Sequence, residues 1–148
     1  MSEYSDCIPE ISLKMNSSSF KRAKIKSSKD CYDYLLQFYG DDIDIYESFF
    51  LLLLNNAMET IGYVKISQGG CAGTVVDIKI VAKYCIDSLA QMVILCHNHP
   101  SGSTIPSKDD IRLTEKIKNV LVLFECPVID HLIITKDNFY SFADEGIL

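Results

Sequence analysis

Side chains that could bind a metal ion or transfer protons gather in one short stretch, CHNHPSGSTIPSKDD, residues 96–110. His97 and His99 are separated by one residue, so in an extended backbone their imidazoles point to the same side. Two imidazoles placed in this way can bind one ion. A catalytic zinc ion takes a third protein ligand at about 2 Å and leaves a fourth position to water. The pair of histidines therefore predicts a metal site that needs one more ligand.

Asp110 can supply the third ligand. It lies in the first turn of a helix predicted to follow this loop, where its carboxylate can point back to the preceding strand. A second interpretation needs no metal, because Ser107-x-x-Asp110 is also the pattern of a helix capping box. The histidines would then be exposed loop residues. The spacing leaves both interpretations open, and the position of the loop after a buried strand favours the metal site.

The elements on either side of this loop must position these side chains. Residues 91–96, QMVILC, form a short apolar run that predicts a buried strand. Residues 107–125, SKDDIRLTEKIKNVLVLFE, have the periodicity of a long amphipathic helix. Its predicted inward face is made of Thr114, Ile117, Leu121 and Phe124.

The remaining elements complete an α/β domain. Residues 27–40 predict a helix with a capping pattern at its start, and residues 46–66 predict a hairpin whose first strand is central in the sheet. A helix capped by Asp77 follows, and residues 127–143 predict a last hairpin. The order predicts a mixed β-sheet flanked by helices. The helix after Asp77 is expected to present Val81, Tyr84, Cys85 and Leu89 on one face.

The composition is that of one globular domain without a general attraction to nucleic acid. The chain has 148 residues, of which 48% are hydrophobic and 23% charged, enough to bury a core. A net charge of -6 gives no electrostatic reason to collect on phosphate backbones. The basic stretch at residues 20–29 is local and favours a solvated arm. We expect residues 1–26 to form an irregular N-terminal arm and residues 27–148 to form the domain.

The location of the protein is predicted from what its sequence does not contain. The longest apolar run, FFLLLL at residues 49–54, is far shorter than the roughly 18 residues of a membrane helix. The acidic start of the chain lacks the pattern of a secretory signal. The six cysteines form no CxxC pair, which favours reduced thiols. We therefore expect a soluble, cytoplasmic protein without a membrane partner.

The metal-site stretch resembles a known motif. H-x-H-P, six residues and then S-x-x-D match the metal-binding motif of the JAB/MPN (JAMM) metalloproteases. The strings HNHPSG, DHLIIT and SFADEGIL strongly resemble the RadC-like branch of bacterial JAB-domain proteins, in a short form without their N-terminal helix-hairpin-helix region. The resemblance covers about residues 27–148. It implies a single JAB/MPN-like (cytidine-deaminase-like) α/β domain.

The resemblance also implies a ligand set and a cofactor. His97, His99 and Asp110 look like ligands of Zn²⁺, and Ser107 looks like the residue whose hydroxyl steadies the bound water or the oxyanion. True zinc deaminases, by contrast, use H-x-E and P-C-x-x-C. This chain has His99 in place of that glutamate and no CxxC pair. The contiguous string HNH is likewise unrelated to the HNH nucleases, whose three residues are dispersed.

A catalytic glutamate is implied at the start of the first core strand. Glu47 of YESFFLLLL occupies that place. Its alternative interpretation is an edge carboxylate that faces solvent. Glu59 and Asp44 are weaker candidates, because Glu59 lies in the second arm of the hairpin and Asp44 precedes the strand.

The implied chemistry is hydrolysis of a peptide or isopeptide. Zinc lowers the pKa of its water from 15.7 to about 7 and polarises the scissile carbonyl. Glu47 would accept the proton of this metal-activated water as it attacks the amide carbonyl, and would return the proton to the leaving amine. Ser107 would donate a hydrogen bond to the oxyanion. The resemblance therefore implies a zinc metallopeptidase or isopeptidase.

Two other functions stay open. RadC-like proteins have traditionally been described as DNA-repair accessories, and residues 20–29 are the one basic segment that could contact nucleic acid. A metal-binding interaction module without catalysis is the second alternative. The sequence does not determine the oligomeric state.

Three features near the site receive plainer interpretations. His131 could orient a ligand from behind, and a satisfied buried histidine is the favoured interpretation. Strand alternation turns Cys96 away from the side that His97 faces. The SQGG string at residues 67–70 predicts a turn near the site.

Overall fold

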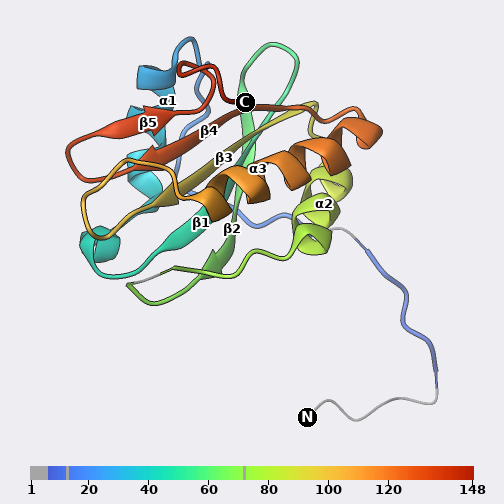
Figure 1. The fold of residues 1–148 in the computed structure, drawn as a ribbon. Coiled ribbons are helices and arrows are strands. Elements are labelled where there is room, and N and C mark those ends of the chain that lie inside the picture. Colours follow the sequence, from blue (N-terminus) through green and yellow to red (C-terminus); the bar gives the residue numbers. More distant parts are fainter. Residues whose placement is uncertain (1–6, 13, 72) are drawn as a thin grey trace.

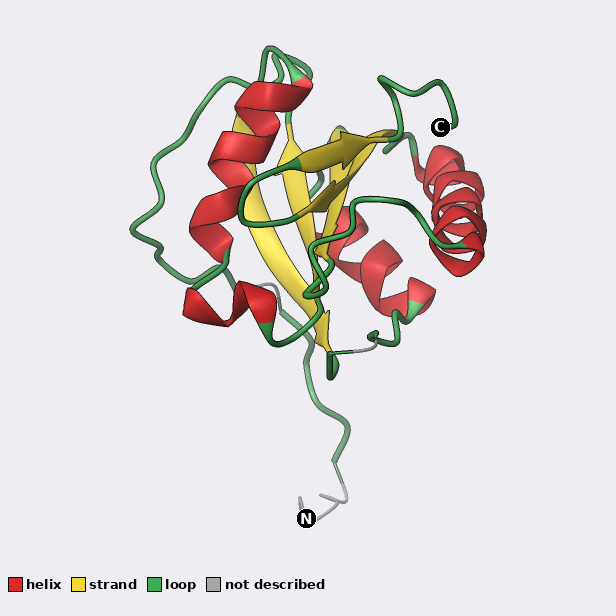
Figure 2. Ribbon diagram, turned by 60° about the vertical axis from the view of Figure 1, so that its left-hand side comes forward, coloured by secondary structure: helices red, strands yellow, loops and turns green. Residues whose placement is uncertain are grey.

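The computed structural model describes residues 7–12, 14–71 and 73–148. In these residues, five strands form one mixed sheet in the order β2-β1-β3-β4-β5. Helix α1 covers one face of the sheet, and helices α2 and α3 cover the other (Figure 1). Figure 2 shows helices on both sides of the sheet. The predicted α/β architecture is confirmed.

The strands and helices have the following bounds. The strands are β1 Ser48–Leu54, β2 Thr60–Gln68, β3 Met92–Asn98, β4 Val128–Ile134 and β5 Phe139–Ser141. The α-helices are α1 Ser28–Leu35, α2 Ile78–Asp87 and α3 Lys108–Leu121. Short 3-10 turns lie at Leu36–Phe38, Asp41–Asp44 and Val122–Phe124. No helix in the described residues is long and apolar enough to cross a membrane.

The connections explain the mixed sheet. β1 pairs antiparallel with β2 and β3, whereas β3 and β4 are parallel and are joined through α3. A parallel pair needs such a crossover, because a short turn only reverses the chain. β1 is an inner strand as predicted, but the middle position of the sheet belongs to β3.

Alternation along β1 and β3 divides the core into two layers. All seven residues of β1 are buried. Phe50 and its alternate neighbours face α1, while Phe49 and its alternate neighbours face α2 and α3. In β3, Cys96 belongs to the α1 layer and Leu95 to the other. His97 therefore points into the layer of α2 and α3, and Cys96 points away from it, as predicted.

Three residues that were predicted to face the core lie at the surface. The prediction was wrong for Leu89 and Phe124, because α2 ends at Asp87 and α3 at Leu121, so the helical period stops before reaching them. Leu89 is 82% exposed. Tyr84 is also exposed, since it is rotated by roughly 100° from its buried neighbour Cys85.

Residues 20–25 pack along β2, the edge strand of the sheet. The amide of Ile25 donates to the carbonyl of Met58 at 2.9 Å, and the amide of Thr60 donates to the carbonyl of Ala23 at 2.9 Å. Ile25 is buried in the α1 layer. These contacts cover part of an edge that would otherwise be open to pairing with another chain.

Candidate metal centre

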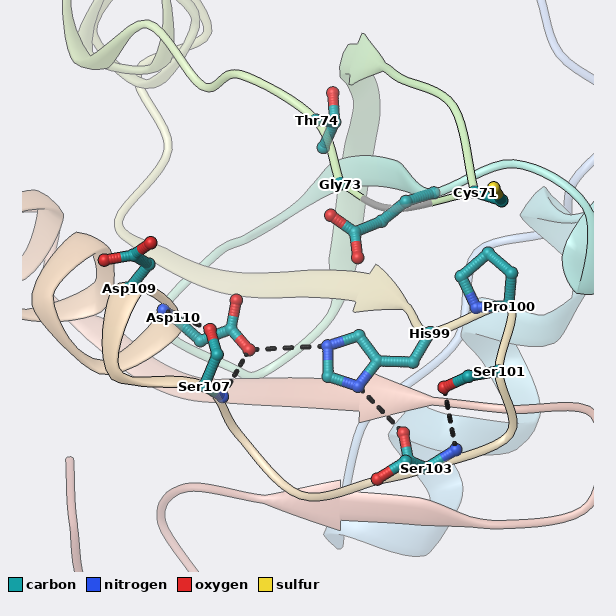
Figure 3. Close-up of a pocket in the computed structure, with 11 residues that line it drawn as sticks. Cys71, Gly73, Thr74, His99, Pro100, Ser101, Ser103, Ser107, Asp109 and Asp110 are labelled. Atoms are coloured by element: carbon teal, nitrogen blue, oxygen red, sulfur yellow. Dashed lines mark hydrogen bonds and ion pairs between the residues drawn. The ribbon is translucent and has the colours of Figure 1, made fainter.

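Three of the residues singled out in the sequence converge where β3 ends and α3 begins. The Nε2 atoms of His97 and His99 are 3.0 Å apart. The Asp110 carboxylate spans both rings, with Oδ1 at 3.3 Å from His97 Nε2 and Oδ2 at 3.3 Å from His99 Nε2. Figure 3 shows the contact between Asp110 and His99. A tetrahedral zinc ion with bonds of about 2.0–2.1 Å separates its ligand atoms by roughly 3.3 Å. The spacing of these atoms therefore fits zinc.

The chemistry of these side chains also suits a cation. His99 Nδ1 lies 2.8 Å from the backbone oxygen of Ser103, which can only accept a hydrogen bond. Nδ1 therefore carries the hydrogen, and Nε2 of the neutral ring presents a lone pair to the cluster. The ionised carboxylate of Asp110 also offers only lone pairs. His99 and Asp110 thus direct electron pairs at the same point, as metal ligands must.

Asp110 takes part in a capping box as well as in this cluster. Its amide donates to Ser107 Oγ at 3.0 Å, and the Ser107 amide donates to Asp110 Oδ2 at 2.8 Å. The two interpretations of the sequence are therefore compatible, because one carboxylate serves both. Capping fixes where the carboxylate points before any ion binds.

The electrostatics of the cluster follow from its geometry. Burial alone would raise the pKa of the Asp110 carboxyl, but the side chains of His97 and His99 beside it outweigh burial and hold this pKa well below its usual range. The hydrogen bond to Asp110 in turn raises the pKa of His99, against the effect of burial. The Asp110 carboxylate therefore stays ionised, and its charge favours a cation between the two rings.

Glu47 is the residue directly before β1, and its side chain faces the same cluster. One of its carboxylate oxygens lies within 4.8 Å of a ring nitrogen of both His97 and His99. This is farther out than the 3.3 Å contacts of Asp110. Glu47 lines the cavity beside the cluster, whereas the weaker candidates Glu59 and Asp44 do not.

Asn98 ties Glu47 to the strand that carries the histidines. Its side chain is fully buried on the α1 side of the sheet. Its Oδ1 accepts from the Ser48 amide at 2.7 Å, and its Nδ2 donates to the carbonyls of Ile43 and Tyr46, each at 2.7 Å. The segment that ends in Glu47 is thereby held to β3. Sequence reasoning missed Asn98, although an amide at the end of a buried apolar strand was a visible signal.

A glycine-rich segment holds Glu47 from the other side. The Gly69 amide donates to the Glu47 carbonyl at 2.9 Å, and the Glu47 amide donates to the Gly70 carbonyl at 3.1 Å. A Cβ on Gly69 would lie only 1.8 Å from the carbonyl oxygen of Gly73, and Gly73 itself has a φ of 144°. This close approach requires glycine at both positions. The turn predicted near the site therefore contacts Glu47 directly.

The cavity beside the cluster is open and polar. Its volume is about 540 Å³, and its lining includes Glu47, His99, Ser107 and Asp110. Figure 3 shows serine and threonine side chains from two loops around it. Ser107 caps α3 with a lone pair of its hydroxyl, which does not use the hydroxyl hydrogen. Capping is therefore compatible with donation from Ser107 into the cavity.

His131 lies directly behind His97. It is fully buried, and its Nε2 is 2.7 Å from His97 Nδ1. We favoured a satisfied buried histidine over one that orients a ligand, and the structure shows that His131 is both buried and in contact with His97.

Cys96 lies on the opposite face of the sheet. Its sulfur is 3.6 Å from the Tyr39 hydroxyl, and burial raises the pKa of its thiol to about 12.

The comparison with protein families agrees with this geometry. The family model of the RadC-like JAB domain matches residues 25–147. The chain therefore belongs to the RadC-like JAB domain family, as the motif in residues 96–110 predicted.

Similar proteins carry the name UPF0758 protein. The relative from Flavobacterium johnsoniae is 43% identical over 127 residues, which are 86% of this chain and 55% of the relative. The relative from Porphyromonas gingivalis is 36% identical over 129 residues, 86% of this chain and 56% of the relative. That from Shewanella denitrificans is 34% identical over 140 residues, 94% of this chain and 61% of the relative. The chain thus spans little more than half the length of these relatives.

Proposed function

We propose that this chain is a zinc-dependent metallopeptidase or isopeptidase. The observation that carries the proposal is the convergence of two imidazole nitrogens and one carboxylate at mutual distances of 3.0 to 3.3 Å. A further carboxylate, from Glu47, lies within 4.8 Å of both rings. Membership of the RadC-like JAB family is compatible with this activity.

His97, His99 and Asp110 would hold the ion, and their donor atoms fit it. When bound, zinc would lower the pKa of a coordinated water to about 7 and would polarise a carbonyl group. Three protein ligands would leave one tetrahedral position open, which distinguishes a catalytic site from a closed structural one.

Glu47 is the proposed general base and general acid. Its carboxylate would take a proton from a water molecule in the cavity as the water oxygen bonds to the carbonyl carbon. The same proton would pass to the amide nitrogen as the C–N bond breaks, which releases an acid and an amine. Asn98 and Gly69 hold the backbone around Glu47 and thereby position its carboxylate.

Ser107 is the proposed donor to the developing oxyanion. Its hydroxyl lines the cavity and still has its hydrogen to donate while it caps α3. A hydrogen bond that strengthens as charge develops on the carbonyl oxygen lowers the barrier more than it aids substrate binding.

The lining of the cavity favours a peptide or isopeptide substrate. Small-molecule sites are mostly apolar and enclosed, whereas this cavity is lined by Thr74, Ser101, Ser103 and other polar residues. Hydroxyl groups can hydrogen-bond to the amide groups of an extended chain.

The proposed location is the reducing cytoplasm. Four cysteines are buried thiols, which fits such a compartment: Cys31, Cys85, Cys96 and Cys126.

Metal analysis is the first test. Native protein, His97→Ala and Asp110→Ala would be purified without added metal, and zinc would be measured per chain. We expect near-stoichiometric zinc in the native protein and little in either variant. Native protein that holds no zinc after metal is supplied would remove the basis of the proposal.

The catalytic step needs a second variant. Glu47→Gln should retain zinc but lose at least about 100-fold in hydrolysis of a peptide and isopeptide library, since proton transfer contributes about 10²–10⁴-fold. Full activity in this variant would rule out Glu47 as the base. Zinc binding without turnover in native protein would indicate a non-catalytic metal-binding module.

The DNA-repair alternative has its own test. Its basis is the basic segment at residues 20–29, part of which is tied to the edge of β2 through Ala23 and Ile25. Replacing the lysines of this segment by glutamine should leave DNA binding unchanged if the chain is a peptidase alone. Salt-dependent DNA binding that is lost in the variant would support the alternative.

A further inference from the structure

A buried row of hydrogen bonds runs from α3 to the candidate metal site. Thr114 Oγ1 lies 2.6 Å from His131 Nδ1, and His131 Nε2 lies 2.7 Å from His97 Nδ1. Thr114 is 3% exposed, His131 0% and His97 2%. Because the three side chains are shielded from water, each hydrogen in the row is placed by the protein itself.

The first hydrogen to be placed in the row is that of the Thr114 hydroxyl. This hydroxyl also lies 2.7 Å from the backbone oxygen of Asp110, one turn earlier in α3. A carbonyl oxygen only accepts, so the single hydroxyl hydrogen must lie between these two oxygens. Thr114 then has only lone pairs to offer His131. His131 Nδ1 must therefore carry a hydrogen and donate it to Thr114.

The second hydrogen follows from the first. His131 is fully buried, and its ring nitrogens contact a hydroxyl and an imidazole rather than a carboxylate, so the ring is neutral and has one hydrogen, on Nδ1. His131 Nε2 is then an acceptor. His97 Nδ1, at 2.7 Å, must supply the hydrogen between them. The lone pair of His97 Nε2 is left facing His99 and Asp110.

We propose that Thr114 and His131 are positioning residues that fix His97 in its Nδ1–H tautomer, so that His97 Nε2 is always available to a metal ion. The row opposes a competing arrangement. Asp110 Oδ1 is 3.3 Å from His97 Nε2 and would otherwise favour a hydrogen on that atom. With a hydrogen there, the lone pair needed by a metal ion is lost.

Packing holds the His131 ring in the orientation that the row needs. Its ring stacks on Phe142 with centroids 4.7 Å apart and meets the edge of Phe49 at 5.6 Å. The Thr114 hydroxyl contacts both the carbonyl of Asp110 on the same helix and His131 on β4. One turn of α3 therefore presents the carboxylate ligand and sets the tautomer of an imidazole ligand.

The inference rests on the proposed metal site but not on hydrolysis, and a matched pair of variants tests it. Thr114→Val keeps the branched shape and removes the hydroxyl, whereas Thr114→Ser keeps the hydroxyl. In a competition assay with a zinc chelator, we expect Thr114→Val to bind zinc about 10- to 100-fold more weakly than native protein. Thr114→Ser should stay within about threefold. Equal zinc affinity in the two variants would overturn the proposal.

A measurement on native protein needs no variant to fold. Histidine ¹⁵N chemical shifts in the metal-free protein, at mildly alkaline pH, report which ring nitrogen carries the hydrogen. We expect His97 and His131 to be protonated on Nδ1 in native protein, and the His97 signal to become mixed in Thr114→Val. A hydrogen on Nε2 of native His97 would overturn the proposal. This result stands apart from the proposed function, because it is read without zinc or substrate.

Discussion

The two faces of the sheet bury polar side chains at the same end of β3, but for different purposes. On the α3 face, Thr114 and His131 lead to His97, whose free nitrogen points into the cluster. On the α1 face, Asn98 bonds to the backbone on either side of Glu47. The first face holds the candidate metal ligands, and the second holds the candidate base.

The difference arises from strand alternation alone. His97 and Asn98 are neighbours in the chain, and β3 sends one to each face. The Asn98 amide is fully hydrogen-bonded and His97 is bonded through Nδ1, and an unsatisfied buried polar group costs about 1–3 kcal/mol. The hydrogen bonds on each face therefore hold their own side chains in place, independently of the other face. The comparison predicts that changes on the α3 face weaken metal binding, while changes on the α1 face weaken hydrolysis and leave the metal in place.

The largest expected effect is the loss of zinc on substitution of Asp110, which belongs both to the metal cluster and to the capping box of α3. Asp110→Asn can still accept from the Ser107 amide, but it lacks the charge that favours zinc. We expect zinc content to fall below about a tenth of the native value, with little loss of stability. Asp110→Ala should lose zinc as well and be destabilised by a further 0.5–2 kcal/mol, roughly the value of a helix cap. Elemental analysis and urea unfolding would check both, and zinc retained in Asp110→Asn would contradict the ligand assignment.

The second effect concerns the α1 face. Asn98→Ala removes the three hydrogen bonds that hold the backbone on both sides of Glu47. We expect a loss of roughly 2–4 kcal/mol in stability, a fall in kcat of at least about tenfold and unchanged zinc per chain. Thr114→Val should show the opposite pattern, with zinc affinity reduced first. If Asn98→Ala lost zinc instead, the two faces would not act separately.

A smaller effect is expected from the glycine segment that contacts Glu47. Gly69→Ala places a methyl group against the Gly73 carbonyl and must displace the segment, at a cost of about 1–3 kcal/mol. Hydrolysis should fall several-fold with zinc unchanged. Gly70→Ala is the matched control, since a Cβ there meets nothing within 4 Å. Equal rates in the two variants would show that the segment does not position Glu47.

The smallest expected effect concerns Asp130 in β4 and is measured as a pH dependence of stability. Burial raises the pKa of Asp130, against hydrogen bonds from Ser141 and from the amides of Ala143 and His131. A carboxyl with a raised pKa in the folded state binds its proton more tightly there than in the unfolded chain. The free energy of unfolding therefore falls as pH rises from the ordinary carboxyl range through the pKa of Asp130 in the folded state.

Asp130→Asn has no such carboxyl. Relative to native protein, the variant should gain unfolding free energy as pH rises above the ordinary carboxyl range. Urea unfolding at several pH values would measure this difference. A constant difference across the range would show that Asp130 does not titrate in this way.

Local patterns in the sequence were enough to predict the α/β class, the strand before the metal-site loop and the capping of α3 by Ser107. They were also enough to bring His97 and His99 to one side of the backbone. These features depend on periods of two or about 3.6 residues and on caps only a few residues long. The sequence therefore determined the candidate metal ligands and their place at the end of β3.

Only the tertiary structure decided what supports the site. His131 meets His97 from 34 residues away, and Thr114 meets His131 from 17 residues away. Asn98 bonds to the backbone around Glu47 from 50, 52 and 55 residues away along the chain. No local period encodes such contacts, because they arise where the packing of strands and helices brings distant residues together. The tautomer of one imidazole and the position of one carboxylate are therefore properties of the folded chain.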